Sequence, residues 1–277
     1  MSWIIFNIAE KIRGFAARQE LKLAQAITVN DLATVKQLLE QGVNPNVSVV
    51  GQKLEPVIFL IFQKNWFTLP EKNYGDRSST SYSITAKEEC LGLLLEYGAN
   101  PNVRDSLGRT MLEIAIVWCM PDIVKLLLLA GADPNLRERN SLTPLMKTVI
   151  LGIQDARPME DKLQIITHLL DSGADINAQT SDGKTALMYA VGNVRMVIVE
   201  FLVSSGASLS ITDHLGNRAS DLIPQKISLP QQKYLRKILT QPQLNIDKYK
   251  YQQFVPEGDR LLASLIDPVE GDRDSNS

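Results

Sequence analysis

A short phrase recurs five times along the chain, and it restricts the fold more than any other feature of the sequence. Each copy is an apolar helix end followed by a glycine and a turn: LLEQGVNPN (38–46), LLEYGANPN (94–102), LLLAGADPN (127–135), LLDSGADIN (169–177) and LVSSGASLS (202–210). Successive glycines are 56, 33, 42 and 33 residues apart, so the longer spacings exceed 33 by 23 and by 9. A constant period with two insertions predicts a repeat array, in which stacked units bury a continuous core.

The composition narrows the class of partner. The formal net charge is -2, from 29 basic and 31 acidic residues, and 44% of the residues are hydrophobic. A nucleic-acid partner would need a basic field to displace counterions, so none is expected. No stretch approaches the roughly 20 apolar residues of a membrane-spanning helix.

The cysteines and the N-terminus bear on the compartment. Cys90 and Cys119 are too few for a disulfide framework or a zinc site, and both sit in apolar helical surroundings. We expect two buried thiols in a reducing compartment. The N-terminus lacks a basic region and a small-residue cleavage site, so it is not expected to be a signal peptide. These features favour the cytoplasm.

Residues 108–135 show how one unit is built. Thr110 suits the N-cap of a first helix, and Glu113 stands three residues later as in a capping box. Pro121 suits the first turn of a second helix. Gly131 is expected to end that helix in the left-handed conformation, which only glycine reaches at low cost.

This layout resembles the ankyrin repeat. The family's motif stands as TMLEIA (110–115), TPLMKT (143–148), TALMYA (185–190) and the weaker EPVIFL (55–60). The resemblance implies an all-α solenoid of antiparallel helix pairs joined by β-turn fingers, with the first Leu of each motif packed inward. The histidine that follows it in the family is replaced throughout, so its hydrogen bonds to the finger must be made differently; the replacements are Ile58, Glu113, Met146 and Met188.

The repeats divide the chain into three parts. We expect an N-terminal amphipathic helix over 1–19, the ankyrin repeat domain over 20–240, and a C-terminal extension over 241–277 that is partly disordered. The domain holds about five or six repeats, including degenerate caps that close the core. They lie near residues 20–48, 49–102, 103–135, 136–177, 178–210 and 211–240.

Both insertions fall after a first helix and before a second one. The longer lies within 61–89 and carries Trp66 and Phe67. These aromatic residues could anchor a partner, or they could fold back onto the second repeat. Residues 71–83 are polar and are expected to be mobile. The shorter insertion lies around 152–161.

The two ends leave alternatives open. Large apolar residues form one helical stripe along the N-terminus: Ile4, Ile5, Ile8, Ile12 and Phe15. That helix could cap the first repeat, bind a partner groove, or lie on a membrane surface. The C-terminal cluster LLASLI (261–266) could dock on the stack or serve as a short helical ligand.

No pattern in the chain predicts catalysis. His168 sits on a helix face and His214 in a finger, and neither lies near a nucleophile pattern. There is no P-loop, dinucleotide fingerprint or C-x-x-C motif. We therefore expect no enzyme activity, no cofactor and no metal.

The resemblance instead implies binding on the concave face made by fingers and first helices. Finger candidates are Arg104, Asp105, Arg137, Arg139 and Gln179; first-helix candidates are Trp118, Lys147, Ile150, Tyr189 and Asn193. Arginine and aromatic residues often dominate interfaces, although finger charges could serve solubility alone. The expected function is a non-catalytic module, monomeric by itself, that binds a protein partner. The alternative is a membrane-associated assembly factor or chaperone that holds an apolar client with its two ends.

Overall fold

The computed structural model describes residues 17–50, 54–62, 77–137, 141–151 and 159–240. These residues belong to two compact units. Unit 1 comprises the chain up to Pro144 together with Asp171–Gly173, and unit 2 comprises Leu145–Leu170 and the chain from Ala174 onward.

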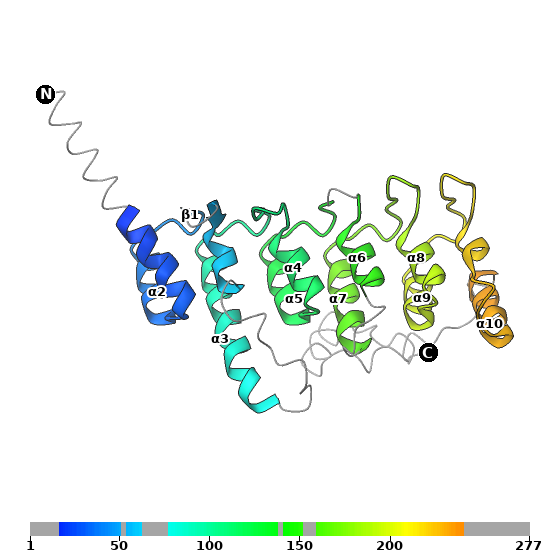
Figure 1. Ribbon diagram of the computed structural model, residues 1–277, viewed down its shortest axis with the longest axis horizontal. Helices are drawn as coiled ribbons and strands as arrows, with labels where there is room; N and C mark the ends of the chain where they lie inside the picture. The colour runs from blue at the N-terminus through cyan, green and yellow to red at the C-terminus, as the bar shows by residue number, and fades with distance from the viewer. Residues whose placement is uncertain (1–16, 51–53, 63–76, 138–140, 152–158, 241–277) are drawn as a thin grey trace, which may run out of the picture. The chain divides into compact units, whose positions relative to one another are not determined.

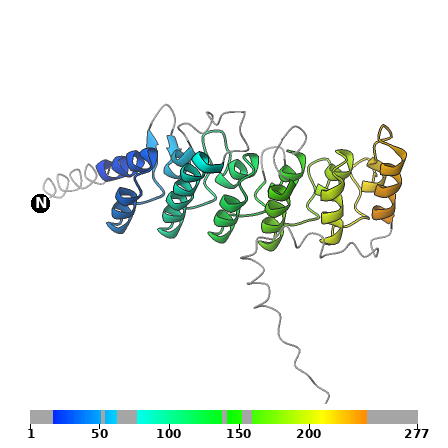
Figure 2. The same cartoon turned by 90° about the horizontal axis from the view of Figure 1, so that it is seen from below.

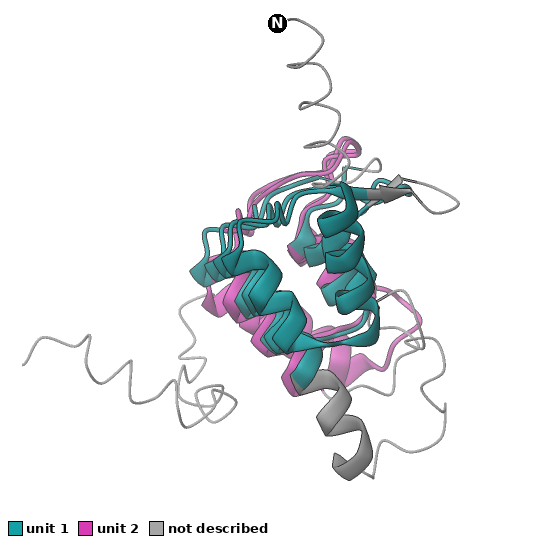
Figure 3. Ribbon diagram, turned by 90° about the vertical axis from the view of Figure 1, so that its left-hand side faces the viewer, with its two compact units in different colours: residues 1–144, 171–173 teal, residues 145–170, 174–277 magenta. Residues whose placement is uncertain are grey.

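Unit 1 is built from helix pairs and one short hairpin (Figure 1). A helix over 17–29 opens it. Then follow α2 (Leu32–Glu40), β1 (Ser48–Val50), β2 (Leu54–Pro56), the 3-10 helix η1 (Val57–Phe62), α3 (Arg77–Glu96), α4 (Met111–Val117) and α5 (Pro121–Leu129). The pairs α4–α5, α2–α3 and α3–η1 pack together. Seen end-on, the first and second helices form separate columns (Figure 3).

Unit 2 repeats this arrangement. Its elements are α6 (Pro144–Ile150), α7 (Met159–Asp171), α8 (Ala186–Gly192), α9 (Met196–Ser204), the 3-10 helix η3 (Ala219–Leu222) and α10 (Leu229–Thr240). The last pair covers the preceding one: α8 packs on η3, and α10 packs on α9, where the Tyr234 hydroxyl donates to the Glu200 carboxylate. The paired helices of the unit are also visible from below (Figure 2).

The fold is the expected ankyrin solenoid of helix pairs and fingers. Within the described residues the only strands are β1 and β2, which pair antiparallel with Ser48 opposite Pro56 in the second finger. The core lies between paired helices, and the first leucines of the motifs are buried as expected. Its largest fully buried side chains include Leu23, Ile58, Leu91, Leu94, Met111, Ile123 and Leu127 in unit 1, and Leu145, Met146, Ile165, Ile166 and Leu169 in unit 2.

The local signals for the helix ends are confirmed. Thr110 accepts from the Glu113 amide at 3.2 Å, and the Glu113 carboxylate accepts from the Thr110 amide at 3.0 Å, which makes a capping box. Pro121 is the first residue of α5. The glycine after each second helix is left-handed, with φ between +81° and +93°. At Gly131 the next amide, that of Ala132, bonds back to Leu127 O at 2.9 Å, so the turn uses carbonyls that the helix leaves unpaired.

The expected mobility of residues 71–83 is wrong from Arg77 onward, because α3 begins there. No glycine or proline interrupts the chain between Arg77 and Gly92. Once the C-terminal half of α3 is packed on its neighbours, each added helical residue gains a hydrogen bond without a new nucleus. Much of the longer insertion therefore lengthens a second helix. The remainder, 63–76, lies outside the described residues.

The turns between paired helices hold three non-glycine residues in the left-handed region. Asn30, Cys119 and Val194 have φ of +58°, +53° and +56°. Asn tolerates this conformation, whereas a β-branched residue is strained in it. Cys119 is half-buried, not buried as expected, because it occupies this turn, while Cys90 is fully buried.

We predict that Val194→Gly stabilises the protein by about 1 kcal/mol, because glycine removes the left-handed strain. The measurement is chemical denaturation followed by circular dichroism. Val197→Gly is the matched control, because the same change inside α9 should destabilise by about 1 kcal/mol. Equal losses for both variants would contradict the strain at Val194.

Candidate functional site

The fingers are held by aspartate side chains at their turns. Asp105 Oδ1 accepts from the amides of Leu107 and Arg109 at 2.9 and 2.8 Å, and its carboxylate also pairs with the Arg109 side chain at 2.7 Å. Asp213 accepts in the same way from the amides of Leu215 and Asn217. Burial favours a higher pKa for Asp213, but these hydrogen bonds outweigh it and the pKa lies below its ordinary value. The candidate Asp105 is therefore part of the finger's own turn.

Two further finger candidates connect successive fingers. Arg104 donates to Gly108 O in its own finger at 2.6 Å and to Arg137 O in the next at 3.1 Å. Gln179 donates likewise to Gly183 O at 2.7 Å and to Thr212 O at 3.1 Å. Arg137 donates to Ser141 O in its own finger at 3.4 Å. These side chains are exposed, but their polar atoms hold the finger row.

At two of the four positions where the family has histidine, another side chain accepts a hydrogen bond at the start of the first helix. The buried Glu113 caps Thr110 and lies 3.7 Å from Arg104 Nη1, so its carboxylate faces the finger. In unit 2 the Met188 thioether accepts weakly from the Thr185 amide at 3.5 Å.

A row of asparagines connects the repeats. Asn46 donates to Gly98 O at 2.8 Å and accepts from the Asn100 amide at 2.7 Å. Asn102 does the same with Gly131 O at 3.0 Å and the Asp133 amide at 2.8 Å. The row continues from Asn135 to Gly173 O, and in unit 2 from Asn177 to the Ser208 amide. The repeated phrase by itself predicts only a turn at these residues. The signal was present, because Asn ends four copies of the phrase and Ser210 ends the last.

The first helices leave one narrow face open. In unit 2, Lys147 and Tyr189 each follow a motif threonine by four residues, and both are half-buried while their neighbours along the helix are buried. Ile150 and Asn193 are half-buried at the ends of the same helices. In unit 1, Trp118 is half-buried at the C-cap of α4.

Two exposed leucines at finger tips were not predicted. Leu107 is 58% exposed and Leu215 is 86% exposed, each in a D-x-L-G turn whose geometry depends on the aspartate. The candidates Trp66, Phe67 and Arg139, and both apolar end segments, lie outside the described residues.

The described residues offer little reactive chemistry. They contain no group of His, Cys, Asp and Glu side chains that could hold a metal ion, and none of their helices is long and apolar enough to cross a membrane. Burial raises the pKa of the Cys90 thiol to about 11, which keeps it protonated.

Comparison with known proteins agrees with this architecture. The family model for ankyrin repeats, three copies, matches residues 23–138 and 117–213. The chain belongs to the ankyrin repeat family. It is 34% identical over 132 residues to ankyrin repeat and SOCS box protein 6 of Homo sapiens. The matched region covers 45% of this chain and 30% of the relative. The Pongo abelii protein of that name matches equally, and the Mus musculus protein is 34% identical over 102 residues, 36% of this chain and 23% of the relative. The match thus spans less than a third of these relatives.

We predict that Asn102→Asp destabilises the protein by about 1 kcal/mol. The change keeps the size and the acceptor but replaces the donor facing Gly131 O by a carboxylate oxygen. Thermal denaturation measures the loss. Ser210→Ala, at the same position of the last copy, should cost a few tenths of that amount, since the hydrogen bonds of Ser210 to other described residues lie within its own turn. Equal stability of Asn102→Asp and wild type would show that the row does not couple the repeats.

We also predict that Gly183→Ala costs about 2 to 3 kcal/mol. Its φ is +78°, and an added Cβ would lie 2.8 Å from the backbone nitrogen and from Cδ2 of His214. Gly216→Ala separates the two causes, because its φ is +81° but its Cβ would meet nothing within 4 Å. That control should cost about 1 kcal/mol, from backbone conformation alone. Similar losses in denaturation of both variants would rule out tight stacking of the fingers.

Proposed function

We propose that these ankyrin repeats bind a protein partner on the finger and first-helix side of unit 2. Ankyrin repeats generally mediate protein–protein interaction. The finer assignment rests on the open face of α6 and α8. There Lys147, Ile150, Tyr189 and Asn193 place a cation, an aliphatic side chain, a phenol and an amide at the surface of helices whose other residues fill the core.

Tyr189 is the central residue of this surface. A tyrosine buries a large rigid area at low entropic cost and adds a hydroxyl. Among the described residues no hydrogen bond uses that hydroxyl, so a partner can supply one. Leu215, at a finger tip in the same unit, adds apolar area. The partner surface that fits is apolar with hydrogen-bonding groups.

In unit 1 the corresponding side carries Trp118, Arg137 and Leu107. Arg104 connects two successive fingers on this side, because its guanidinium donates to a carbonyl in each of them. We further propose that the chain has no catalytic role and is a monomer by itself. We also propose that it is cytoplasmic, which is supported by its two cysteines, since neither is in a disulfide.

The assembly-factor alternative depends on the N-terminal amphipathic helix expected over 1–19 and on the C-terminal cluster at 261–266. Residues 1–16 and 261–266 lie outside the described residues, and no observation on the described ones favours that function. The ankyrin repeat and SOCS box relatives do not identify the partner of this chain, because the match covers 30% of their length or less.

We predict that Tyr189→Ala combined with Lys147→Glu lowers recovery of the specific partner about tenfold or more. Loss of a central aromatic residue in an interface costs about 2 kcal/mol. The measurement is affinity purification of the tagged full chain with quantitative mass spectrometry. Val197→Ala, a half-exposed apolar residue of α9, is the control and should leave recovery unchanged.

The two variants must first show unchanged circular dichroism spectra and similar melting temperatures. With folding intact, full retention of every partner by Tyr189→Ala with Lys147→Glu would disprove this surface. Equal losses with Val197→Ala would place the interface on the second helices instead.

A further inference from the structure

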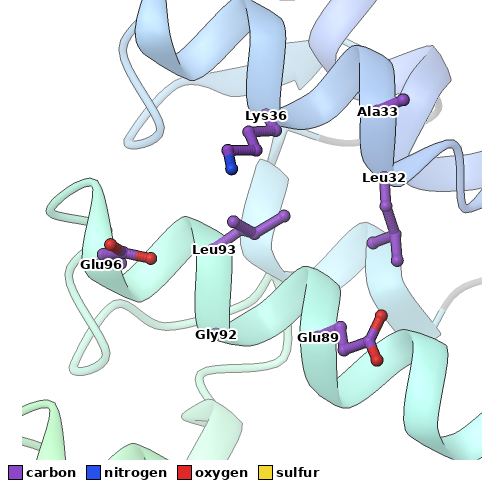
Figure 4. A pocket seen from close by; sticks show the side chains of 7 residues that line it. All are labelled: Leu32, Ala33, Lys36, Glu89, Gly92, Leu93 and Glu96. Atoms are coloured by element: carbon purple, nitrogen blue, oxygen red, sulfur yellow. The ribbon is translucent and has the colours of Figure 1, made fainter.

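We propose that a groove between α2 and α3 in unit 1 binds a helical segment of a protein partner that carries basic side chains. The groove has a volume of about 510 Å³. It lies on second helices, so it is separate from the proposed finger and first-helix surface. Its lining residues are Leu32, Ala33 and Lys36 of α2 and Glu89, Gly92, Leu93 and Glu96 of α3 (Figure 4).

Each wall is one face of a helix. The α3 residues are spaced by three, four and seven positions from Glu89, which places them on one side of that helix. In Figure 4 the side chains of Leu32 and Leu93 lie between the two helices, and Lys36 extends from α2 toward α3. The two leucines are half-buried, while Ala33 and Gly92 add almost no bulk. The space between neighbouring helices suits the ridge of a third helix.

Gly92 has no explanation inside the unit. Glycine destabilises a helix interior relative to alanine. A Cβ at Gly92 would meet nothing within 4 Å, so no described neighbour requires its absence. Six residues before the glycine that ends each second helix, the other four copies all carry a side chain: Lys36, Lys125, Thr167 and Glu200. Only α3 has a residue without a side chain at this position. The physical use of such a glycine is the close approach of another segment, and the groove opens at that point.

The charges at the rim select the occupant. Glu89 and Glu96 are exposed on the α3 wall, on either side of Gly92, and Lys36 is exposed on the α2 wall. Within the described part of the chain none of these three side chains forms an ion pair. Seven helical residues span about 10 Å. A helix with an apolar ridge and basic residues about two turns apart on the side facing α3 therefore matches both acids.

The test uses the isotope-labelled full chain and two synthetic amphipathic helical peptides of fifteen residues as probes. Both peptides share one leucine and isoleucine ridge; one has lysines on its flanks and the other has glutamates. We expect the lysine peptide to shift the NMR resonances of Gly92 and Leu93 saturably, and to bind at least tenfold more tightly than the glutamate peptide. Glu89→Lys with Glu96→Lys should reverse that preference.

Variants at Gly92 separate binding from structure. Gly92→Ala should raise the melting temperature and weaken binding of the lysine peptide several-fold. A glycine with a purely structural role would not give this combination of higher stability and weaker binding. Gly92→Trp should abolish binding with the circular dichroism spectrum intact. Tyr189→Ala, in unit 2, should leave peptide binding unchanged, so that failure of this proposal and of the partner surface remain distinguishable.

Four results would overturn the proposal. The first two are equal binding of the two peptides and no shift of the Gly92 resonance when peptide is added. The third is a Gly92 resonance that moves, in the absence of peptide, when residues 1–16 are deleted. The fourth is a Gly92 resonance that moves with protein concentration. The third would make the chain's own N-terminal segment the occupant, and the fourth a second copy of the chain.

Discussion

The structure depends on one constraint: a helix pair of about thirty residues cannot bury its apolar faces alone, so each repeat must be covered by its neighbours. The side-chain bonds of Asn46 and Asn102 act at these joints. Each asparagine joins the end of one repeat to the glycine carbonyl and a backbone amide of the next, and so holds the spacing at which the helices pack. The finger row uses the same device, because Arg104 and Gln179 each donate to their own finger and to the following one.

Because so many polar groups serve these joints, the surface proposed for a partner uses positions that the joints do not. Tyr189 on a first helix and Leu215 at a finger tip are of this kind. The second helix α3 departs from the period differently, by its length and by the bare position at Gly92. The two proposed surfaces thus have different chemistry: one is aromatic and mixed in polarity, the other a narrow apolar groove with an acidic wall.

Local signals predicted local structure well. Thr110 with Glu113, Pro121 and Gly131 each occupy the helix position that their chemistry favours, because capping and backbone conformation depend on residues within one turn. The finger candidates were harder to judge. Arg104 and Asp105 are predicted to bind a partner, and in the fold both side chains also form hydrogen bonds inside the row of fingers. Asn102 was assigned to a turn, since its second partner, the Asp133 amide, lies 31 residues away in the sequence.

The sequence by itself determined the family, the helix pairs and the positions of the stops, because the period and the glycine turns are local and repeated. Only the tertiary structure decided which polar side chains are occupied and which remain open to a partner. Hydrogen bonds such as those of Asn46 and Gln179 join residues of successive repeats, and burial depends on the neighbour that covers a face. Both properties arise when the repeats stack, so no single copy of the phrase contains them.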